Sequence, residues 1–486
     1  MLVFMSQYTM TIDGQPVSSP GTLKVINPAT GEVFAEVPDC TREQLDLAME
    51  SAQRAFPGWK DDYEQRRAVM YACADALEAN ADELGRLATL EQGMPLAAGV
   101  AGVHGSARNF RWYADLDVPR VTVQDDDAAV VEIVRRPIGV IAAIKPWNVP
   151  IGMAVNTIAP AFRAGCTVVL KPSPYTPVVT AAMGEVLRDI VPAGVLNIVS
   201  GGNELGQWMT EHPVPRGISF TGSIATGKKV NVAAAADLKR VLLELGGNDA
   251  AIVLDDADPA DVAEKLFWPA FRNSGQICMA VKRVFVPAEM EQQVVEALAA
   301  KARSVKVGNG LDEGVELGPI NNEPQFERVK GLVAEALAQG AVAAAGGHPI
   351  EGDGYFFEPT ILTGAAEGTR IVDEEQFGPA LPVLTYRTVA EAIDRANATN
   401  YGLGASVWSA DPLRAAEVAE RLEAGTVWIN THMQLTHDAP FTGMKWSGLG
   451  SEMGLWSIYA YTDPQTVFRT RSQVIKKGAG EAPGAW

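Results

Sequence analysis

The chain has 486 residues, of which 47% are apolar and 20% are charged, and its formal charge at pH 7 is −19. A chain of this length exceeds what one hydrophobic core usually organises, so we expect roughly two or three domains. The composition is that of an ordinary soluble globular protein. The acidic balance and the lack of any block of Lys or Arg argue against a nucleic-acid or anionic-membrane surface, because both require a basic footprint. We therefore expect a small-molecule partner, no nucleic acid and no membrane.

The first residues and the cysteines indicate the compartment. The start, MLVFMSQYTMTIDG, has no basic region, no long apolar core and no cleavage site of a signal peptide. No segment approaches the roughly twenty apolar residues of a membrane span. The four cysteines, Cys40, Cys73, Cys166 and Cys278, are scattered without a CxxC pair, and the five histidines are dispersed. These patterns predict a cytoplasmic protein with neither a disulfide framework nor a catalytic metal.

Helices are expected first along the chain. Residues 41 to 92 carry the amphipathic segments TREQLDLAMESAQRAF and YEQRRAVMYACADALEANADELGRLATLEQG. Thr41 with Glu43 or Gln44 has the pattern of a helix start, and Gly93 is placed to end the last helix. The amino-terminal region is therefore predicted to be helical and ordered.

From about residue 131 the pattern changes to alternating strands and helices. Short β-branched runs that feed into loops occur in VEIVRRPIGVIAAIKPWN, GCTVVLKPSPYTP, VLNIVSGG, RGISFTGS and KRVLLELGG. Helical segments lie between them, in PIGMAVNTIAPAFRAG, in TAAMGEVLRDIVPAG and from about 226 to 236. This βαβ rhythm up to about residue 247 predicts a doubly wound parallel sheet.

A second α/β series follows. It begins with a strand and an Asp-Pro helix start in NDAAIVLDDADPADVAEKLF and leads to Cys278 and the strand KRVFVPAEM. Later helices (EPQFERVKGLVAEALAQG, VAEAIDRANATN, DPLRAAEVAERLEAG) alternate with strands (PVLTYR, GASVWS, TVWINT). The tail offers one short strand and then a Gly/Pro-rich end that we expect to be mobile.

The segment FTGSIATGKKV is a candidate phosphate-binding turn. Gly222, Gly227 and Lys228 have the GxxxxGK spacing of a P-loop, but Lys229 stands where that motif needs Ser or Thr for Mg²⁺. A Gly-rich turn between a strand and a helix remains, which either offers its backbone N–H groups to a pyrophosphate or is a plain tight turn. The chain contains no GxGxxG dinucleotide fingerprint and no GxSxG serine-hydrolase elbow.

Four polar residues follow or interrupt apolar strands, and each has two interpretations. Lys171 at a strand end either contacts a ligand or is solvated. Asn148 of PWN either caps the next helix or donates to an oxyanion, and its spacing favours the cap. Glu244 in VLLELGGN is either a general base of raised pKa or a carboxylate at the rim of the sheet. A lone cysteine such as Cys278 is more often a small buried hydrophobe than a nucleophile.

Taken together, these segments resemble the NAD(P)-dependent aldehyde dehydrogenase superfamily. The matching motifs run in order over nearly the whole chain: NPATGEVFAEVP (Asn27 to Pro38), PWN, KPSPYTP, FTGS, LELGGN, GQIC, EEQFGP (Glu374 to Pro379) and PFTGMKWSGLGSEMG (Pro440 to Gly454). The resemblance implies an α/β fold with a Rossmann-type cofactor domain, an α/β catalytic domain and a small β oligomerisation element. The implied boundaries are 1–117 and 139–246 for the NAD(P)-binding domain, 247–457 for the catalytic domain, 118–138 and 458–474 for the oligomerisation strands, and 475–486 for the mobile tail.

The resemblance implies that the protein oxidises an aldehyde to a carboxylic acid with three catalytic residues. The Cys278 thiolate would add to the aldehyde carbon, and the Asn148 amide and the Cys278 backbone N–H would hold the oxyanion. After hydride has left for the nicotinamide, water activated by Glu244 would hydrolyse the thioester. Because a free thiol of pKa about 8.5 is mostly protonated at neutral pH, we expect a helix N-terminus or the bound nicotinamide to activate Cys278.

The resemblance also implies NAD as the cofactor, with NADP as an alternative. Lys171 and Ser173 would contact the adenosine ribose, and Glu375 and Phe377 the nicotinamide ribose and ring. The expected cofactor-binding residues are Ile144, Pro146, Trp147, Lys171, Ser173, Gly222, Ser223, Gly227, Leu245, Glu375 and Phe377. NAD-preferring relatives often have Glu three residues after the Lys, where it binds the ribose 2′-OH. This chain has Pro174 there, so no carboxylate repels a 2′-phosphate.

The substrate and the assembly are less constrained. Val149, Met153 and Asn156 share one helical face by their spacing, where many relatives carry larger aromatic residues, and this predicts a roomier, partly polar pocket. Asn430, Thr431 and His432 either line that pocket or form a surface turn. The resemblance implies a homodimer or homotetramer. Two alternative functions are a CoA-acylating relative, which Glu244 disfavours, and a catalytically silent binding protein.

Overall fold

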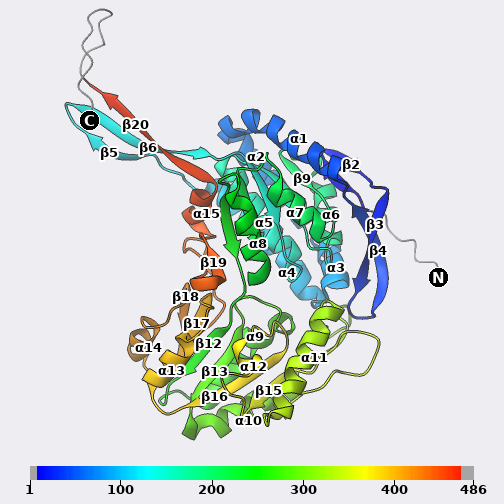
Figure 1. Ribbon diagram of the computed structural model, residues 1–486, viewed down its shortest axis with the longest axis vertical. Coiled ribbons are helices and arrows are strands. Elements are labelled where there is room, and N and C mark those ends of the chain that lie inside the picture. Colours follow the sequence, from blue (N-terminus) through cyan, green and yellow to red (C-terminus); the bar gives the residue numbers. More distant parts are fainter. Residues whose placement is uncertain (1–7, 472–486) are drawn as a thin grey trace, which may run out of the picture.

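The computed structural model describes residues 8–471, which form two α/β bodies joined end to end, with a narrow sheet that projects from the first body (Figure 1). The predicted mobile tail, 475–486, lies outside the described residues. Among the described residues, no helix is both long and apolar enough to cross a membrane.

The first body is built on an eight-stranded sheet in the order β19-β11-β10-β7-β8-β9-β1-β2. Its strands are β1 (Met10–Ile12), β2 (Gln15–Val17), β7 (Val140–Ile144), β8 (Thr167–Lys171), β9 (Leu196–Ile198), β10 (Gly217–Thr221), β11 (Arg240–Glu244) and β19 (Gly448–Leu449). The five strands β9-β8-β7-β10-β11 are parallel. Their order is that of a doubly wound sheet, with the switch point between β7 and β10, which confirms the predicted Rossmann-type architecture.

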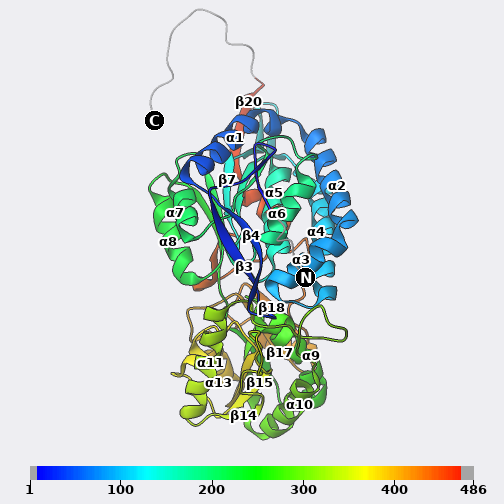
Figure 2. The same ribbon diagram turned by 90° about the vertical axis from the view of Figure 1, so that its right-hand side faces the viewer.

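Helices cover both faces of this sheet because its strands are apolar on both sides. In β7, Ile141 and Ala143 pack in one cluster of buried side chains, while Val140 and Ala142 pack in another. This alternation is the two-residue period of a strand buried on both faces. Figure 2 shows α7 and α8 on one side of the sheet and α2 and α4 on the other. The helices of this body are α1 (Arg42–Asp61), α2 (Tyr63–Ala79), α3 (Ala81–Gln92), α4 (Leu96–Asp115), α5 (Pro150–Ala164), α6 (Val178–Leu187), α7 (Asn203–Glu211), α8 (Ile224–Ala235) and α15 (Gly454–Ala460).

The second body is also an α/β body, built on a seven-stranded sheet in the order β14-β15-β16-β13-β12-β17-β18. Its strands are β12 (Asp249–Val253), β13 (Val281–Pro287), β14 (Val342–Ala345), β15 (Thr360–Thr363), β16 (Ala380–Tyr386), β17 (Gly404–Trp408) and β18 (Thr426–Ile429). All neighbours except β14 and β15 are parallel. Its helices are α9 (Pro259–Phe271), α10 (Glu291–Ser304), α11 (Glu323–Ala338), α12 (Arg370–Asp373), α13 (Val389–Asn397) and α14 (Pro412–Ala419).

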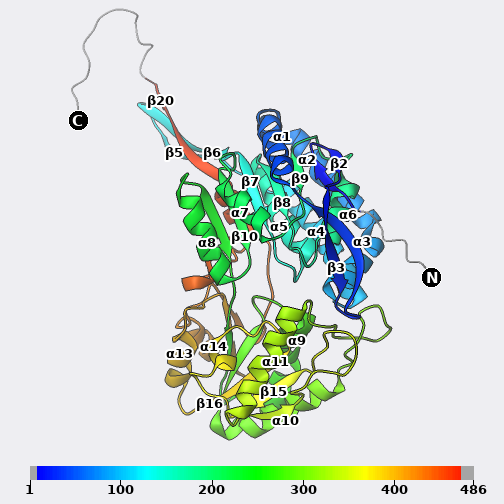
Figure 3. The same cartoon turned by 45° about the vertical axis from the view of Figure 1, so that its right-hand side comes forward.

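Two small sheets complete the chain. A hairpin of β3 (Gly21–Asn27) and β4 (Glu32–Asp39) lies along the first body. The projecting sheet has the order β20-β6-β5, from β5 (Val121–Asp125), β6 (Ala129–Pro137) and β20 (Thr462–Thr470) (Figure 3). These strands fall within the segments predicted to mediate oligomerisation, although residues 458 to 460 belong to α15 and residues 472 to 474 lie outside the described residues.

The predicted helix boundaries in the first body have the expected local chemistry. Thr41 caps α1. Its capping box is completed by Gln44 and not by Glu43, the other residue considered for this position. Gly93 ends α3 with φ of 99°, a left-handed conformation that favours glycine. In the second body, Asp258 caps α9 and is followed by a proline, as the Asp-Pro pattern predicted.

Candidate active site

The carboxyl ends of β7, β8, β10 and β11 meet at one edge of the first sheet, and four predicted site residues lie there. Asn148 follows β7, Lys171 ends β8, Gly222 follows β10 and Glu244 ends β11. Ligands of doubly wound sheets bind at this edge, beside the switch point. The second body contributes the loop that carries Cys278, which comes just before β13.

Asn148 does not cap the following helix, so that interpretation was wrong. Val149 is the N-cap residue of α5, and no side chain caps this helix. The buried Asn148 side chain instead reaches the second body, where its Nδ2 donates to the Gln276 carbonyl at 2.9 Å. A side-chain amide has two N–H donors, and this bond uses one of them. It therefore fixes the amide and leaves a second N–H for another acceptor.

The loop before Cys278 has an unusual backbone. A short 3-10 helix, η1 (Arg272–Gly275), contains Asn273, Ser274 and Gly275 with φ of 55°, 54° and 72°. Left-handed conformations cost free energy in residues with a Cβ and persist only where the surroundings hold them. Asn273 Nδ2 donates to the Asn148 carbonyl at 3.0 Å, and a Cβ on residue 275 would collide with the Gly378 backbone. The loop is thus held from both bodies.

Side chains also hold every backbone carbonyl from residue 276 to residue 280. Asn148 takes the first, as described above. The Lys282 ammonium donates to the carbonyls of Ile277 at 2.9 Å, Cys278 at 2.5 Å and Ala280 at 3.4 Å. His432 Nε2 bonds to the Met279 carbonyl at 3.0 Å, and because a carbonyl only accepts, this nitrogen carries the proton. The backbone around Cys278 is therefore rigidly placed.

Cys278 is half-buried, and its charge environment opposes ionisation in the free protein. Burial raises the pKa of its thiol to about 12, the Lys282 ammonium lowers it, and the carboxylates of Glu375, Glu244 and Asp249 raise it. Cys278 lies in a turn and not at a helix N-terminus, so that expected source of activation is not present. The Lys282 ammonium therefore favours the thiolate, against the effects of burial and of the three carboxylates.

Glu244 is buried, which excludes the interpretation of a carboxylate at the rim of the sheet. Burial raises its pKa well above the ordinary value, the buried Glu452 raises it further, and Lys145 opposes both. No described group hydrogen-bonds to Glu244 Oε1. The Lys145 ammonium is held by Ser219 Oγ at 2.9 Å and Thr221 Oγ1 at 3.2 Å. A buried carboxyl with a free oxygen and a raised pKa suits a general base near neutral pH.

Glu375 lies against the two glycines that follow Glu244. Its Oε1 accepts from the Gly247 backbone N–H at 3.3 Å and lies 3.4 Å from Lys282 Nζ. A Cβ on Gly246 would overlap the Glu375 carboxyl group, so glycine is required for this approach. Phe377, from the same loop, meets Trp147 edge-on at a centroid distance of 5.2 Å. Residues expected to bind the cofactor are thus brought together from both bodies.

The residues expected at the adenosine and phosphate end fit an anionic dinucleotide. Lys171 is not solvated, as one interpretation held, but buried beside the buried Ser173, and burial lowers the pKa of its ammonium to about 8. Ser223 caps α8 by accepting from Thr226 N, and the first turn of this helix has no acidic residue. Its remaining N–H groups and its dipole favour an anion. Leu245 packs so closely on Gly227 that a Cβ there would collide with it.

The lysine also shares its strand register with another predicted residue. Ile144 at the end of β7 pairs with Lys171 at the end of β8, and Lys145 N donates to the Lys171 carbonyl at 2.9 Å. Pro146 follows directly. Ile144, Pro146 and Lys171, which are all expected to bind the cofactor, therefore lie at two adjacent strand ends.

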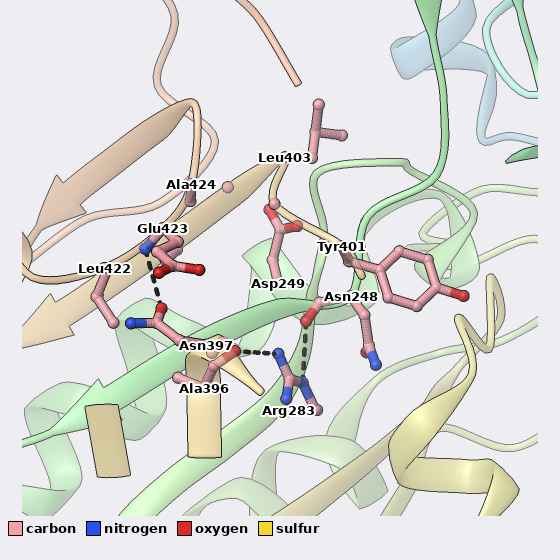
Figure 4. A pocket seen from close by; sticks show the side chains of 14 residues that line it. Asn248, Asp249, Arg283, Ala396, Asn397, Tyr401, Leu403, Leu422, Glu423 and Ala424 are labelled. Atoms are coloured by element: carbon pink, nitrogen blue, oxygen red, sulfur yellow. Dashed lines mark hydrogen bonds between the residues drawn. The ribbon is translucent and has the colours of Figure 1, made fainter. Parts of the chain in front are cut away.

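A small cavity of about 20 Å³ lies in the second body, beside the start of β12 (Figure 4). Asp249 lines it, and no described group donates a hydrogen bond to either of its carboxylate oxygens. The buried Arg283 also lines the cavity and donates to the carbonyls of Asn248 at 3.0 Å and Ala396 at 3.2 Å. His432 Nε2 lies 3.6 Å from Asp249 Oδ2, so His432 belongs to this buried region and not to a surface turn.

The three residues predicted to share a helical face do line one cavity. Val149, Met153 and Asn156 face α4 across a space of about 250 Å³. Helix α4 contributes Gly102, Gly105, Ser106 and Asn109, which follow the same spacing of three and four residues. Asn109 Nδ2 donates to Asn156 Oδ1 at 2.9 Å. The small residues of α4 explain why there is room between the two helices.

Four further charged residues at the site were not predicted from the sequence: Lys145, Lys282, Asp249 and Glu452. The two lysines stand in the apolar runs VIAAIKPWN and MAVKRVFV, and a charge inside such a run is the signal that would have marked them as buried. Asp249 directly precedes the run AAIV in the same way. Glu452 lies in an irregular segment, where no pattern in the sequence predicts burial.

The doubly wound sheet, with polar residues at the carboxyl ends of its strands beside the cysteine loop of the second body, is the arrangement of a nicotinamide-dependent dehydrogenase. The family model of the aldehyde dehydrogenase family matches residues 16–467, and the chain belongs to this family. It oxidises aldehydes with a nicotinamide dinucleotide.

Named relatives and solved structures agree with this. The chain is 38% identical to aminoaldehyde dehydrogenase 1 of Pisum sativum, with 97% of each chain covered. It is 37% identical to the NADP(+) succinate-semialdehyde dehydrogenase of Escherichia coli, over 91% of this chain and 93% of the relative. The NAD+ complex of an aldehyde dehydrogenase from Bacillus cereus superposes with a TM-score of 0.93 at 34% identity, over 96% of this chain and 97% of that one.

If the Asn148 amide donates to the oxyanion, as the sequence predicts, Asn148→Ala is expected to lower kcat by about 10²–10³. The bond to Gln276 is lost as well, at a cost of about 1 kcal/mol in unfolding free energy. Steady-state kinetics with denaturant unfolding separates the two effects. Near-full activity in a folded variant would show that Asn148 is not the oxyanion donor.

Glu244→Gln is expected to lower kcat by about 10²-fold and to remove the rise of kcat with pH, since the base form exists only above the raised pKa. In the wild type, a carboxyl group whose pKa is higher in the folded than in the unfolded protein stabilises the fold at pH values below its unfolded pKa. This contribution is lost as the pH rises through the folded pKa. The melting temperature of Glu244→Gln, relative to that of the wild type, should therefore increase as the pH rises. Glu452→Gln is the matched control: it should keep the pH-dependent rise and move it to lower pH.

Proposed function

We propose that the protein oxidises a bulky aldehyde to a carboxylic acid with Cys278 as nucleophile, Asn148 as oxyanion donor and Glu244 as general base. The observation that carries this proposal is the meeting of the three residues across the two bodies. Asn148 bonds to the Gln276 carbonyl, two residues from Cys278, and the charge of Glu244 acts on the Cys278 thiol. A nucleophile, a donor and a base within one site are what acyl transfer through a thioester requires.

In this mechanism, each of the three residues has a distinct role. The Cys278 thiolate forms a bond to the aldehyde carbon, and the oxygen becomes an oxyanion. The free N–H of Asn148 Nδ2 and the backbone N–H of Cys278 stabilise that charge. The nicotinamide, when bound, accepts the hydride. Glu244 then takes a proton from water, whose oxygen attacks the thioester and releases the acid and the thiolate. A CoA-acylating enzyme needs no such base, so the buried Glu244 favours hydrolysis.

We propose NAD as the preferred cofactor, held by the residues expected from the sequence. Lys171 and Ser173 take the adenosine ribose, Gly222, Ser223 and Gly227 take the phosphates at the start of α8, and Ile144, Pro146 and Leu245 form the walls. Trp147, Glu375 and Phe377 contact the nicotinamide side. The anion-favouring start of α8 and the buried ammonium of Lys171 support this assignment.

The cavity between α4 and α5 supports a bulky substrate without a carboxylate tail. Val149, which directly follows Asn148, begins its wall. None of the described residues that line it is a lysine or an arginine, while Glu452 and His437 do line it. A carboxylate would be desolvated there without a cation to pair with. We therefore expect aromatic or amine-bearing aldehydes rather than semialdehydes of dicarboxylic acids.

We also propose the assembly, the compartment and the division of the chain. The projecting sheet exposes Val121, Val123, Val467 and Phe468, which supports a homodimer or homotetramer joined through it. The four cysteines are all free, which supports a reducing compartment such as the cytoplasm. The domain boundaries 1–117 and 139–246, 247–457, and 118–138 with 458–474 stay predictions.

A panel of aldehydes tests the reaction and the substrate. Phenylacetaldehyde and 3-aminopropanal are expected to give higher kcat/KM than acetaldehyde or succinate semialdehyde, with formation of the reduced nicotinamide measured by absorbance. No CoA should be required. Preference for short aliphatic aldehydes would contradict the proposed pocket, and activity only with added CoA would contradict hydrolysis. Preference for the semialdehyde would point to Arg108, which lies beside Gly105, as the missing cation.

Pro174→Glu tests the cofactor end. The new carboxylate is expected to raise KM for NADP by about tenfold or more while leaving KM for NAD within about twofold, because it lies near the 2′ position and repels a phosphate there. Pro174→Gln keeps the size without the charge and should affect NADP little. Equal effects of the two variants on NADP would show that residue 174 does not face the 2′ position.

A further inference from the structure

Lys282 connects the loop that carries Cys278 to the loop that carries Glu375. It is the second residue of β13, its side chain is 3% exposed, and its ammonium bonds to three backbone carbonyls of the loop that ends at Ala280. Carbonyl oxygens carry only partial charge, so these bonds orient the ammonium without neutralising it. The carboxylate at its side is Glu375, with Oε1 at 3.4 Å from Nζ.

The Glu375 side chain makes weak contacts that it can exchange for others, while hydrogen bonds fix its backbone. Its backbone N–H donates to the Tyr401 hydroxyl at 3.3 Å, and its carbonyl accepts from Arg328 at 3.1 Å. Its carboxylate has a weak bond of 3.3 Å to the Gly247 N–H and the contact with Lys282. A partly buried carboxylate with so few partners gains from stronger donors, such as the hydroxyl groups of a ribose.

The same two residues act on Cys278 with opposite sign. The Lys282 ammonium favours the thiolate, and the Glu375 carboxylate opposes it. The other charged groups that face the thiol, Glu244 and Asp249, also oppose it, and His432 contacts the loop through the Met279 carbonyl. With Glu375 beside Lys282, the positive charge is compensated, which agrees with the raised pKa of the thiol.

We propose that Lys282 is the positioning residue that makes Cys278 reactive, and that Glu375 withholds this effect until the cofactor draws its carboxylate away. The proposal rests on the assigned roles of Cys278 and Glu375. When Glu375 turns to the ribose hydroxyls, the ammonium is left uncompensated beside the thiol. The thiol proton then passes to solvent water, and the thiolate forms only when the cofactor is in place. Unproductive reaction of the cysteine with electrophiles is thereby limited in the free enzyme.

The test is the pH profile of Cys278 alkylation by iodoacetamide, followed by mass spectrometry of the peptide that contains it, with and without saturating NAD. In the wild type, NAD should move the midpoint of the profile to lower pH. Lys282→Met should slow alkylation about tenfold or more near neutral pH and abolish the NAD shift, since one pKa unit corresponds to a factor of ten. Lys282→Arg keeps the charge and should retain the shift.

Glu375→Gln is the matched variant, because it removes the charge and keeps the shape. It should alkylate faster than the wild type without NAD, and NAD, with its binding checked by calorimetry, should add little. A midpoint in Lys282→Met equal to that of the wild type, or slower alkylation of Glu375→Gln, would overturn the proposal. A merely structural role of Lys282 would change the melting temperature and leave the midpoint in place.

A separate control tests whether Cys278 is the nucleophile. Stoichiometric alkylation of Cys278 should abolish aldehyde oxidation. If the alkylated enzyme kept its activity, Cys278 would not be the nucleophile, whatever the pH profiles gave. The other cysteines, Cys40, Cys73 and Cys166, are buried and serve as internal references for labelling.

Discussion

The hydrogen bond from Asn148 Nδ2 to the Gln276 carbonyl is the interaction on which the site depends, because it joins the end of a strand in the first body to the cysteine loop of the second. The connection continues on both sides. Gln276 Oε1 accepts from Asn321 N at 2.8 Å, and Asn321 Nδ2 donates to the Glu91 carbonyl at 2.8 Å. The Glu91 carboxylate in turn accepts from the first two N–H groups of α6. The loop that carries Cys278 is therefore placed by a buried polar network that spans both bodies, and such networks hold one geometry only when each member is satisfied.

The same region carries charges that the fold does not neutralise. Glu244, Glu375 and Asp249 lie near one thiol, with Lys282 and Lys145 as the cations that act on them. Charges in a buried site cost free energy unless they are paired, and breaking a buried pair typically costs about 3–5 kcal/mol. A site of this kind is less stable than an apolar core of the same size. Proteins accept that cost where protonation states have to differ from those in water.

The sequence predicts the parts of this structure that depend on local chemistry or on strong patterns. The βαβ alternation predicts the doubly wound sheet, and Thr41, Gly93 and Asp258 mark helix boundaries correctly, because capping is local. Spacing alone misplaced Asn148 as a cap, since its actual partner is 128 residues away in the chain. Lys282 and Glu452 escaped notice because a residue's burial depends on which segments fold over it. The helices α4, α7 and α10 were not recognised either, and α4 has three glycines in LAAGVAGVHG, which weaken its helical pattern.

The return of β19 to the first sheet has a consequence for how the chain acquires its structure. β19 pairs with β11 through Leu243 with Leu449 and Glu244 with Gly448, although the whole second sheet lies between them in the sequence. During synthesis, the strand that ends at Glu244 keeps an open edge until residue 449 has left the ribosome. Pairings over such a distance form slowly, and partly folded chains with open edges associate with one another. The first body cannot therefore mature independently, and truncation anywhere within the second would leave the edge beside Glu244 open to aggregation.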